Sequence, residues 1–290
     1  MITGSTKLLG VIGYPVEHSL SPMMHNAAIA QMGINYLYVP LPVKPENLAD
    51  AMRGFEAIGL VGFNATIPHK QAIIPLLTSV SDLAQAVGAV NTVCRTEQGW
   101  MGTNTDVQGF LAPLQGITRD WANAEVVVLG NGGAARAVVA GCAQLGVGHV
   151  HVVGRQLEKV QAFQTSWHES PLKVAISAHG WNAIDALLPN ASLIVNTTPI
   201  GMYPHGNASP LSQHQLAKLS PGAIAYDLIY TPRPTQFLQD AQAVGAIALD
   251  GLEMLVQQGA AALELWTQQP APVNIMRATL EQHLAQRMGH

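Results

Sequence analysis

The stretch EVVVLGNGGAAR, residues 125–136, decides the fold of this 290-residue chain. Its first part, Glu125–Gly130, is mostly apolar, ends in glycine and predicts a buried strand. Residues 134–145 then have the composition of a helix, which Gly146 closes. A buried strand that turns through glycines into a helix is typical of parallel α/β sheets.

The glycine turn itself suits an anion. Gly130 permits a tight turn, Gly132 lets the backbone come close to a pyrophosphate, and Ala135 allows the helix to pack on the strand. Free amides at the start of the helix attract negative charge. A glycine-rich turn without a ligand is the alternative, but the flanking strand and helix favour a dinucleotide site.

The end of the next strand distinguishes NAD from NADP. An NAD site usually has a carboxylate there, which binds the ribose 2′-hydroxyl. This chain has Gly154 followed by Arg155 and Lys159 instead, and two cations suit a 2′-phosphate. The sequence therefore predicts NADP, with a basic pair on an exposed loop as the alternative.

Strand and helix patterns alternate along the chain, with no internal repeat. The predicted strands cover residues 8–13, 36–40, 60–66, 125–130, 149–154, 193–196, 223–228 and 246–249. The predicted helices cover residues 22–32, 45–55, 134–145, 253–267 and 272–286. This alternation predicts an α/β protein of two units with parallel or mixed sheets.

Composition argues against several classes of protein. Hydrophobic residues make up 48% of the chain and charged residues 11%, so a large core is expected and disorder is not. A net charge of −4 without basic runs argues against nucleic acid as a partner. We find no signal peptide and no apolar stretch long enough to span a membrane. Cys94 and Cys142 lack metal or disulfide spacing, and the expected location is the cytoplasm.

Polar side chains gather at the end of another predicted strand. Asn64, Thr66 and Lys70 surround Pro68, whose ring fixes the backbone and removes a donor. Amide, hydroxyl and ammonium groups at this spacing can hold a polyhydroxylated molecule and move a proton. Each residue alone is also common in ordinary turns.

The order of six segments resembles the shikimate dehydrogenase family along nearly the whole chain. The segments are SLSP (19–22), NATIPHK (64–70), GAVNT (88–92), NTD (104–106), GNGGAAR (130–136) and GLEMLVQQ (251–258). The resemblance implies NADP-dependent reversible reduction of 3-dehydroshikimate to shikimate, a step of aromatic amino acid biosynthesis. It also implies a substrate-binding domain of residues 1–105 plus 252–290 and a Rossmann-type NADP-binding domain of residues 106–251. The C-terminal helices would then return to the first domain.

The same resemblance implies that Lys70 and Asp106 form the acid/base pair at the reacting hydroxyl. Lysine is usually a solvated surface charge, and Asp106 could instead cap the helix that begins at Val107. The resemblance implies these further substrate-binding residues: Ser19, Ser21, Asn64, Thr66, Asn91, Tyr230 and Gln258. A helix cap for the serines, a turn for Asn91 and a wet helix face for Gln258 are the alternatives.

Cofactor contacts follow from the resemblance in the same way. They are Gly130, Asn131, Gly132, Gly133, Ala134, Ala135, Gly154, Arg155, Lys159, Asn196, Thr197, Thr198, Leu228, Gly251 and Met254. Residues 196–202 are expected at the nicotinamide end. The family usually has Asn and Thr where this chain has Gly154 and Gln156, which removes an amide and a hydroxyl from the phosphate pocket.

The eleven histidines show no metal-site spacing such as HExxH, and no metal is expected. The expected partner is a small-molecule substrate, bound by a monomer or homodimer. Two alternatives stay open: a sibling dehydrogenase that takes quinate or uses NAD, and a non-catalytic ligand-binding homologue. Loss of Lys70 or Asp106 would favour the second alternative, and both residues are present.

Overall fold

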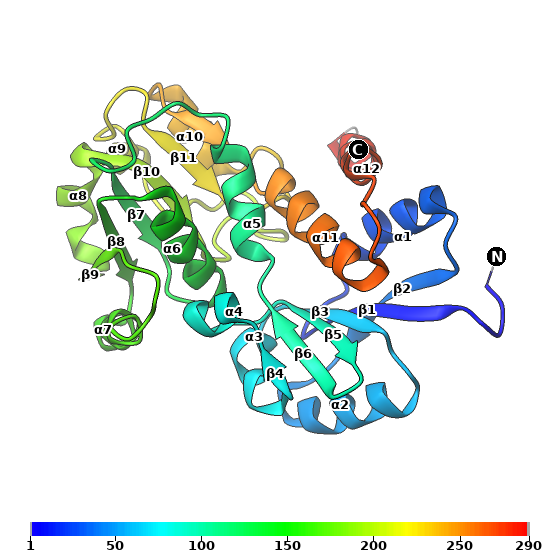
Figure 1. Ribbon diagram of the computed structural model, residues 1–290. Helices are drawn as coiled ribbons and strands as arrows, with labels where there is room; N and C mark the ends of the chain where they lie inside the picture. The colour runs from blue at the N-terminus through cyan, green and yellow to red at the C-terminus, as the bar shows by residue number, and fades with distance from the viewer. Residues whose placement is uncertain (1, 289–290) are drawn as a thin grey trace. The chain divides into compact units, whose positions relative to one another are not determined.

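The computed structural model describes residues 2–288, which form two compact α/β units (Figure 1). Unit 1 comprises Met1–Gly109 and Leu255–His290, and unit 2 comprises Phe110–Met254. The sequence predicts boundaries before residues 106 and 252, whereas the units divide after Gly109 and after Met254. Asp106 therefore belongs to unit 1. Its side chain also bonds to residues of that unit, Lys70 and Asn91.

Unit 1 is built on a six-stranded mixed sheet in the order β2-β1-β3-β5-β6-β4. Its strands are β1 (Lys7–Gly13), β2 (Tyr36–Pro42), β3 (Gly62–Ala65), β4 (Ser79–Val80), β5 (Thr92–Thr96) and β6 (Gly99–Thr103). β1 runs parallel to β2 and β3, while β5 runs antiparallel to β3 and β6. One apolar core of this unit joins Ile12, Phe63 and Val93 of the sheet to Phe55 of a neighbouring helix.

The helices of unit 1 come from both ends of the chain (Figure 1). They are α1 (Ser21–Met32), α2 (Leu48–Ala57), α3 (His69–Ala72), α4 (Asp82–Val87) and α12 (Val273–Met288), while α5 (Asp106–Leu111) and α11 (Leu252–Thr267) contain the unit boundaries. α12 packs against α1, and Trp266 of α11 donates its indole N–H to the carbonyl of Val93 at 3.0 Å. The predicted return of the C-terminal helices to the first unit is thus confirmed.

Unit 2 is a parallel sheet of six strands in the order β12-β11-β10-β7-β8-β9. The strands are β7 (Glu125–Leu129), β8 (His149–Gly154), β9 (Ala175–Gly180), β10 (Ala191–Asn196), β11 (Ile224–Asp227) and β12 (Ile247–Leu249). The helices are α6 (Gly133–Leu145), α7 (Leu157–Thr165), α8 (Ile184–Leu187), α9 (Gln213–Leu216) and α10 (Gln236–Ala243). Both units also contain short 3₁₀ turns, which are η1 (Pro45–Asn47) and η2 (Ile74–Leu76) in unit 1 and η3 (Ala112–Leu114), η4 (Trp181–Ala183) and η5 (Leu188–Asn190) in unit 2.

The predicted α/β class is confirmed. The strands that the sequence analysis did not predict have weak local signals. The hairpin of β5 and β6 turns through Glu97 and Gln98, which lack the usual Asn-Gly or Asp-Gly signature. β9 is an edge strand that contains alanine and glycine, which are depleted in strands. No helix among residues 2–288 is both long and apolar enough to cross a membrane.

Candidate active site

Lys70 and Asp106 form a shielded ion pair in unit 1. Lys70 lies in α3, just beyond the turn that follows β3, and Asp106 begins α5 shortly after β6. Nζ of Lys70 lies 2.6 Å from Oδ2 of Asp106, and the two side chains are only 16% and 7% exposed. The ammonium has no other hydrogen-bond partner within residues 2–288, so two of its three N–H donors stay available to a ligand.

The carboxylate of Asp106 does not cap its helix. Oδ1 of Asn104 accepts the hydrogen bond from the N–H of Val107 at 3.3 Å, which is the interaction expected of a capping side chain. Asp106 instead directs its oxygens to Lys70 and to Asn91. The capping interpretation of Asp106 is therefore wrong.

Asn91 orients the carboxylate from the other side. Its Nδ2 donates to Oδ1 of Asp106 at 2.8 Å, and its Oδ1 accepts from the backbone N–H of Thr105 at 2.7 Å. The backbone donor fixes which end of the amide faces which partner. Asn91 is 2% exposed, so the carboxylate is held in a network with little water.

Gln258 of α11 joins the same network. Its Oε1 lies 3.3 Å from Nδ2 of Asn91, and its Nε2 donates to the carbonyl of Leu255 at 2.8 Å. The side chain is buried, so the alternative of a wet helix face is wrong. Gln258 keeps one amide hydrogen for a ligand.

Asn64 is committed to protein partners at both ends of its amide. Nδ2 donates to the carbonyl of Asn91 and to Oγ1 of Thr92, each at 3.1 Å. Oδ1 accepts from the hydroxyl of Tyr38 at 2.7 Å. A ligand hydroxyl can therefore still bond to the second lone pair of Oδ1, and Asn64 would act as an acceptor.

The two serines and Thr66 complete the polar set of unit 1. Oγ of Ser19 accepts the N–H of Ser21 at 3.3 Å. The N-cap position of α1 is Leu20, and no side chain caps that helix. The hydroxyl of Thr66 has no hydrogen-bond partner among the described residues. These hydroxyls are suited to bind a carboxylate or a ring hydroxyl.

Three members of this network were not predicted as site residues: Tyr38, Thr92 and Thr105. Oγ1 of Thr92 and Oγ1 of Thr105 lie 3.0 Å apart, between the amides of Asn64 and Asn91. Both threonines stand inside the GAVNT and NTD segments, which could have drawn attention to them. Tyr38 lies in the middle of β2, where no sequence signal separates it from a core residue.

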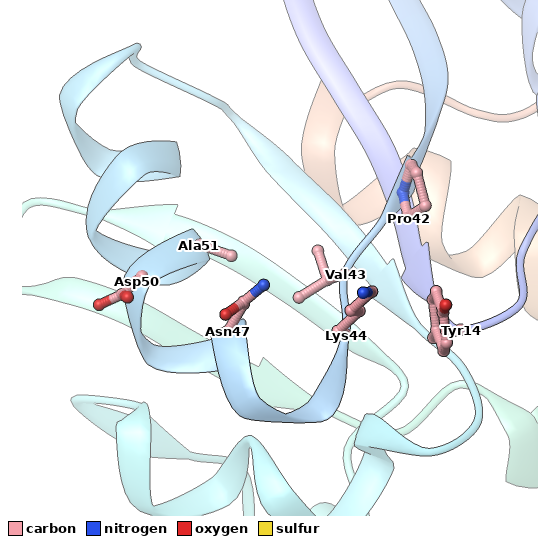
Figure 2. A pocket seen from close by; sticks show the side chains of 7 residues that line it. All are labelled: Tyr14, Pro42, Val43, Lys44, Asn47, Asp50 and Ala51. Carbon is pink, nitrogen blue, oxygen red and sulfur yellow. The ribbon is translucent and has the colours of Figure 1, made fainter.

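A separate pocket of about 560 Å³ lies in unit 1 (Figure 2). Its lining residues are Tyr14, Pro42, Val43, Lys44, Asn47, Asp50 and Ala51. The ammonium of Lys44 stands 6.0 Å from the centroid of the Tyr14 ring. None of the predicted site residues lines this pocket, so its exposed Lys44 and Asn47 serve below as control positions.

In unit 2 the glycine turn has the geometry of an anion cradle. Gly132 is the N-cap of α6, no side chain caps the helix, and a Cβ on Gly132 would meet nothing within 4 Å. Gly130 has φ +108°, and a Cβ there would lie 2.6 Å from Oγ1 of Thr197. The open amides at Gly133 and Ala134 suit a pyrophosphate, so the residues present fit a dinucleotide.

Arg155 and Lys159 are the residues predicted to bind a 2′-phosphate. Arg155 follows β8 directly, and Lys159 is in the first turn of α7. Both side chains are exposed, and neither forms a hydrogen bond or ion pair within the described residues. Gly154 lies beside Asn131, because a Cβ on Gly154 would be 3.7 Å from Oδ1 of Asn131.

We call residues 196–202 the nicotinamide segment; it follows β10 and is held by Asn196. Oδ1 of Asn196 accepts from the N–H of Thr198 at 3.0 Å and from its Oγ1 at 2.7 Å. Nδ2 of Asn196 donates to Oδ1 of Asp227 at 3.0 Å and to the carbonyl of Ile200 at 3.2 Å. Asn196 is fully buried, and both of its amide hydrogens are used within the protein.

The remaining predicted residues of unit 2 follow β11 and β12. The N–H of Leu228 donates to the carbonyl of Asn196 at 3.1 Å, and a Cβ on Gly251 would lie 2.1 Å from the carbonyl oxygen of Leu228. Only glycine fits position 251 without a shift of the backbone. Met254 is buried. Tyr230 is half-buried and lies in unit 2, whereas the other predicted substrate-binding residues lie in unit 1.

The histidines of the described chain form no metal cluster. No group of three or more His, Cys, Asp or Glu residues within residues 2–288 could hold a metal ion. His149, His151 and His179 do lie together on the unit 2 sheet, with Nδ1 of His151 3.1 Å from Nε2 of His179. Burial lowers the pKa of His151 and of His179, so both imidazoles favour the neutral form.

The chain joins a parallel sheet with an uncapped glycine turn to an α/β unit that shields a lysine–carboxylate pair. Together these features define the class of protein, a two-domain dinucleotide-dependent oxidoreductase. Residues 11–93 match the family described as the shikimate dehydrogenase substrate binding domain, and residues 251–281 match the shikimate 5′-dehydrogenase C-terminal domain. The chain belongs to the shikimate dehydrogenase family.

Curated relatives and solved structures agree with this assignment. The chain is 62% identical over 286 residues to the shikimate dehydrogenase (NADP(+)) of Trichormus variabilis, covering 98% of this chain and 99% of the relative. A crystal structure of a shikimate dehydrogenase in complex with NADP+ has a TM-score of 0.88 at 38% identity, covering 98% of both chains. The Thermus thermophilus enzyme in complex with NADP(H) and shikimate has a TM-score of 0.83 at 33% identity, covering 96% of this chain and 99% of that one.

Proposed function

We propose that this chain catalyses the NADP-dependent, reversible reduction of 3-dehydroshikimate to shikimate. The observation that carries the proposal is the 2.6 Å contact between Lys70 and Asp106, shielded from water yet with lysine donors available. We infer the reaction from the family to which the chain belongs, and the side chains of the site are chemically suited to it. We place the reaction in aromatic amino acid biosynthesis on the same ground.

The chemistry requires a proton acceptor beside a bound nicotinamide. Bound NADP would supply the acceptor for the hydride of the carbon that carries the reacting hydroxyl. Lys70 and Asp106 accept the hydroxyl proton as a pair, and they return it in the direction of reduction. Because the two groups share one short hydrogen bond, the proton belongs to the pair and not to either residue.

The rest of the unit 1 site is suited to a polyhydroxylated acid. Ser19 and Ser21 would donate hydroxyls to the carboxylate, and we propose that Tyr230 of unit 2 also binds near it. Thr66, Asn64 and Gln258 would bind the ring hydroxyls. Asn64 keeps a single lone pair for a ligand, because its other hydrogen bonds are made within the protein.

NADP would be held entirely through unit 2 residues predicted for it. The amides from Gly130 to Ala135 bind the pyrophosphate, and Arg155 with Lys159 binds the 2′-phosphate. The nicotinamide segment, Leu228, Gly251 and Met254 line the other end. Gly154 and Gln156 leave the phosphate with fewer neutral donors, so Arg155 carries most of the preference over NAD.

The experiment follows absorbance of the reduced nicotinamide when the protein is mixed with shikimate and NADP. Parallel reactions replace shikimate with quinate and NADP with NAD. Shikimate with NADP is expected to give the highest kcat/KM. A faster reaction with quinate or with NAD would replace the proposal by the sibling dehydrogenase, and no reaction with any pair would indicate a ligand-binding homologue.

The cellular setting is a further part of the proposal. Cys94 and Cys142 are free and buried, and burial raises the pKa of Cys94 to about 11 and that of Cys142 to about 12. Such thiols behave as inert hydrophobic side chains. We propose a cytoplasmic enzyme that works as a monomer or homodimer, which light scattering after size-exclusion chromatography would distinguish.

A further inference from the structure

Asp227 is a buried carboxylate that the proposed mechanism does not use. It ends β11 in unit 2 and is 0% exposed. Oδ1 accepts from Nδ2 of Asn196 at 3.0 Å and from the N–H of Ile229 at 3.1 Å. Oδ2 accepts from Oγ1 of Thr235 at 2.7 Å. All three donors are neutral, so the charge is met by hydrogen bonds alone.

Asn196 transmits this anchor to the nicotinamide segment. The bond to Asp227 fixes Nδ2 on that side, which leaves Oδ1 facing the N–H and hydroxyl of Thr198. Oγ1 of Thr198 in turn accepts the N–H of Ile200 at 3.2 Å. An unbroken series of hydrogen bonds therefore runs from Asp227 through Asn196 into the backbone of the segment.

The other bonds of Asp227 hold the chain that leaves β11. The N–H of Ile229 is drawn toward the carboxylate, and the carbonyl of Ile229 accepts the N–H of Gly251 at 3.1 Å. Thr235 is the N-cap of α10, where its Oγ1 accepts the N–H of Leu238. One carboxylate thus fixes two loops at the carboxyl edge of the sheet, where dinucleotides bind in parallel α/β sheets.

We propose that Asp227 is a positioning residue that sets the conformation of the nicotinamide segment through Asn196, and thereby the placement of the nicotinamide end of NADP. The inference rests on the proposed function in one respect, that residues 196–202 face the cofactor. A carboxylate suits this place because it accepts from both loops at once, and hydrogen bonds to a charged acceptor are stronger than neutral ones.

The test compares Asp227→Ala with Asp227→Asn. Asparagine keeps an oxygen for Asn196 and Ile229, and its amide can donate to Oγ1 of Thr235, so the network is retained. Alanine removes every acceptor. Asp227→Ala is expected to speed amide hydrogen exchange at Thr198 and Ile200 about tenfold or more, and to weaken NADP binding by a similar factor. Asp227→Asn is expected to retain most of the exchange protection at Thr198 and Ile200 and most of the NADP affinity.

Thr235→Val is the matched control, because it removes the donor to the other oxygen of the same carboxylate. It is expected to leave exchange at Thr198 near the wild-type rate. Should Asp227→Ala fail to fold, Asn196→Ala breaks the same series one bond later and is expected to show the same loss. Unchanged exchange at Thr198 in folded Asp227→Ala or Asn196→Ala, or equal damage by alanine and asparagine at position 227, overturns the inference.

Hydrogen exchange and NADP binding by calorimetry are read without shikimate. An enzyme that binds NADP but does not oxidise shikimate would contradict the proposed function and leave this inference standing. Faster exchange in the nicotinamide segment with unchanged NADP affinity would contradict the link to the cofactor. The shikimate dissociation constant should change less than that of NADP, because Tyr230 is the one predicted substrate ligand that lies in unit 2.

Discussion

Asp106 in unit 1 and Asp227 in unit 2 are both buried carboxylates near the end of a strand, yet their partners differ. Asp106 bonds to a cation and to one amide, and the cation keeps two donors free. Asp227 bonds to an amide, a hydroxyl and a backbone N–H, and each donor is a neutral group already fixed in the protein.

The difference separates a group that can react from one that holds structure. A proton can move only where a partner remains able to exchange it with a ligand, and the ammonium of Lys70 meets that condition. The three hydrogen bonds of Asp227 come from neutral donors of the protein, so none of them leads to a substrate.

Lys70→Ala should produce the largest effect. Loss of the acid/base partner should lower kcat by about 10²–10⁴-fold. The shikimate dissociation constant should change much less, because binding is shared among several hydroxyl and amide groups. Lys44→Ala, at an exposed lysine of the pocket in Figure 2, is the matched control and should retain normal kcat. A Lys70→Ala enzyme with near-normal turnover would remove Lys70 from the mechanism.

Asp227→Asn should change how stability depends on pH. Burial raises the pKa of Asp227 from 3.8 to about 6, against hydrogen bonds from Thr235, Ile229 and Asn196 that lower it. Because the pKa of Asp227 is raised in the folded state, its protonated carboxyl group favours folding. This contribution to stability is complete below pH 3.8 and is lost as the pH rises through about 6. The shift corresponds to about 3 kcal/mol.

The asparagine variant has no such loss, so its melting temperature relative to wild type should rise between pH 4 and pH 7. Thermal unfolding followed at a series of pH values measures the difference. A difference that stays constant over this range would mean that Asp227 ionises at an ordinary pKa. A difference that falls with pH would reverse the sign and contradict the burial argument.

Arg155→Ala should affect the two cofactors unequally. A guanidinium on the 2′-phosphate should contribute about ten- to a hundredfold in KM for NADP, while NAD has only a hydroxyl there. We expect NAD kinetics to stay nearly unaltered. Arg53→Ala, at an exposed arginine paired with Asp50, is the control. Equal losses for NADP and NAD would show that Arg155 is only a surface charge.

Asn91→Ala should have a smaller effect that acts through Asp106. Removal of the amide takes away one hydrogen bond to the carboxylate and should lower kcat by about tenfold. Asn47→Ala, at an exposed asparagine of the Figure 2 pocket, should leave kcat unchanged. If only the shikimate KM rises in Asn91→Ala, the amide binds substrate and does not orient Asp106.

Chelation should have no effect, since hydride transfer to a nicotinamide needs no metal. Rates after prolonged dialysis against a strong chelator should equal those before it. Activity that is lost and then restored only by a divalent cation would refute the expectation of a metal-free enzyme.

Much of the fold could be predicted because its signals are local. The apolar run and glycines at residues 125–132 set β7 and the start of α6, and Gly33 and Gly146 mark helix ends in the left-handed conformation. The hairpin of β5 and β6 could not be predicted in this way. β5 and β6 pair directly with each other, and their outer edges pair with β3 and β4, which come earlier in the chain.

The site residues also differ in whether a local sequence signal marks them. Lys70 and Asp106 could be named because their segments are distinctive, but their 2.6 Å contact joins residues far apart in the chain. Tyr38 and Asp227 act by holding other side chains, and such roles have no motif. Only the bonds to Asn64 and Asn196 reveal them.

We propose that the Lys70–Asp106 pair takes the hydroxyl proton in the step that transfers the hydride. The most direct measurement is the isotope effect on kcat with shikimate deuterated at the carbon that carries the reacting hydroxyl, in wild type and in Lys70→Ala. If the pair takes part in that step, the variant slows it selectively, and its isotope effect should exceed that of the wild type. An equal or smaller isotope effect in Lys70→Ala, with turnover close to normal, would contradict the claim.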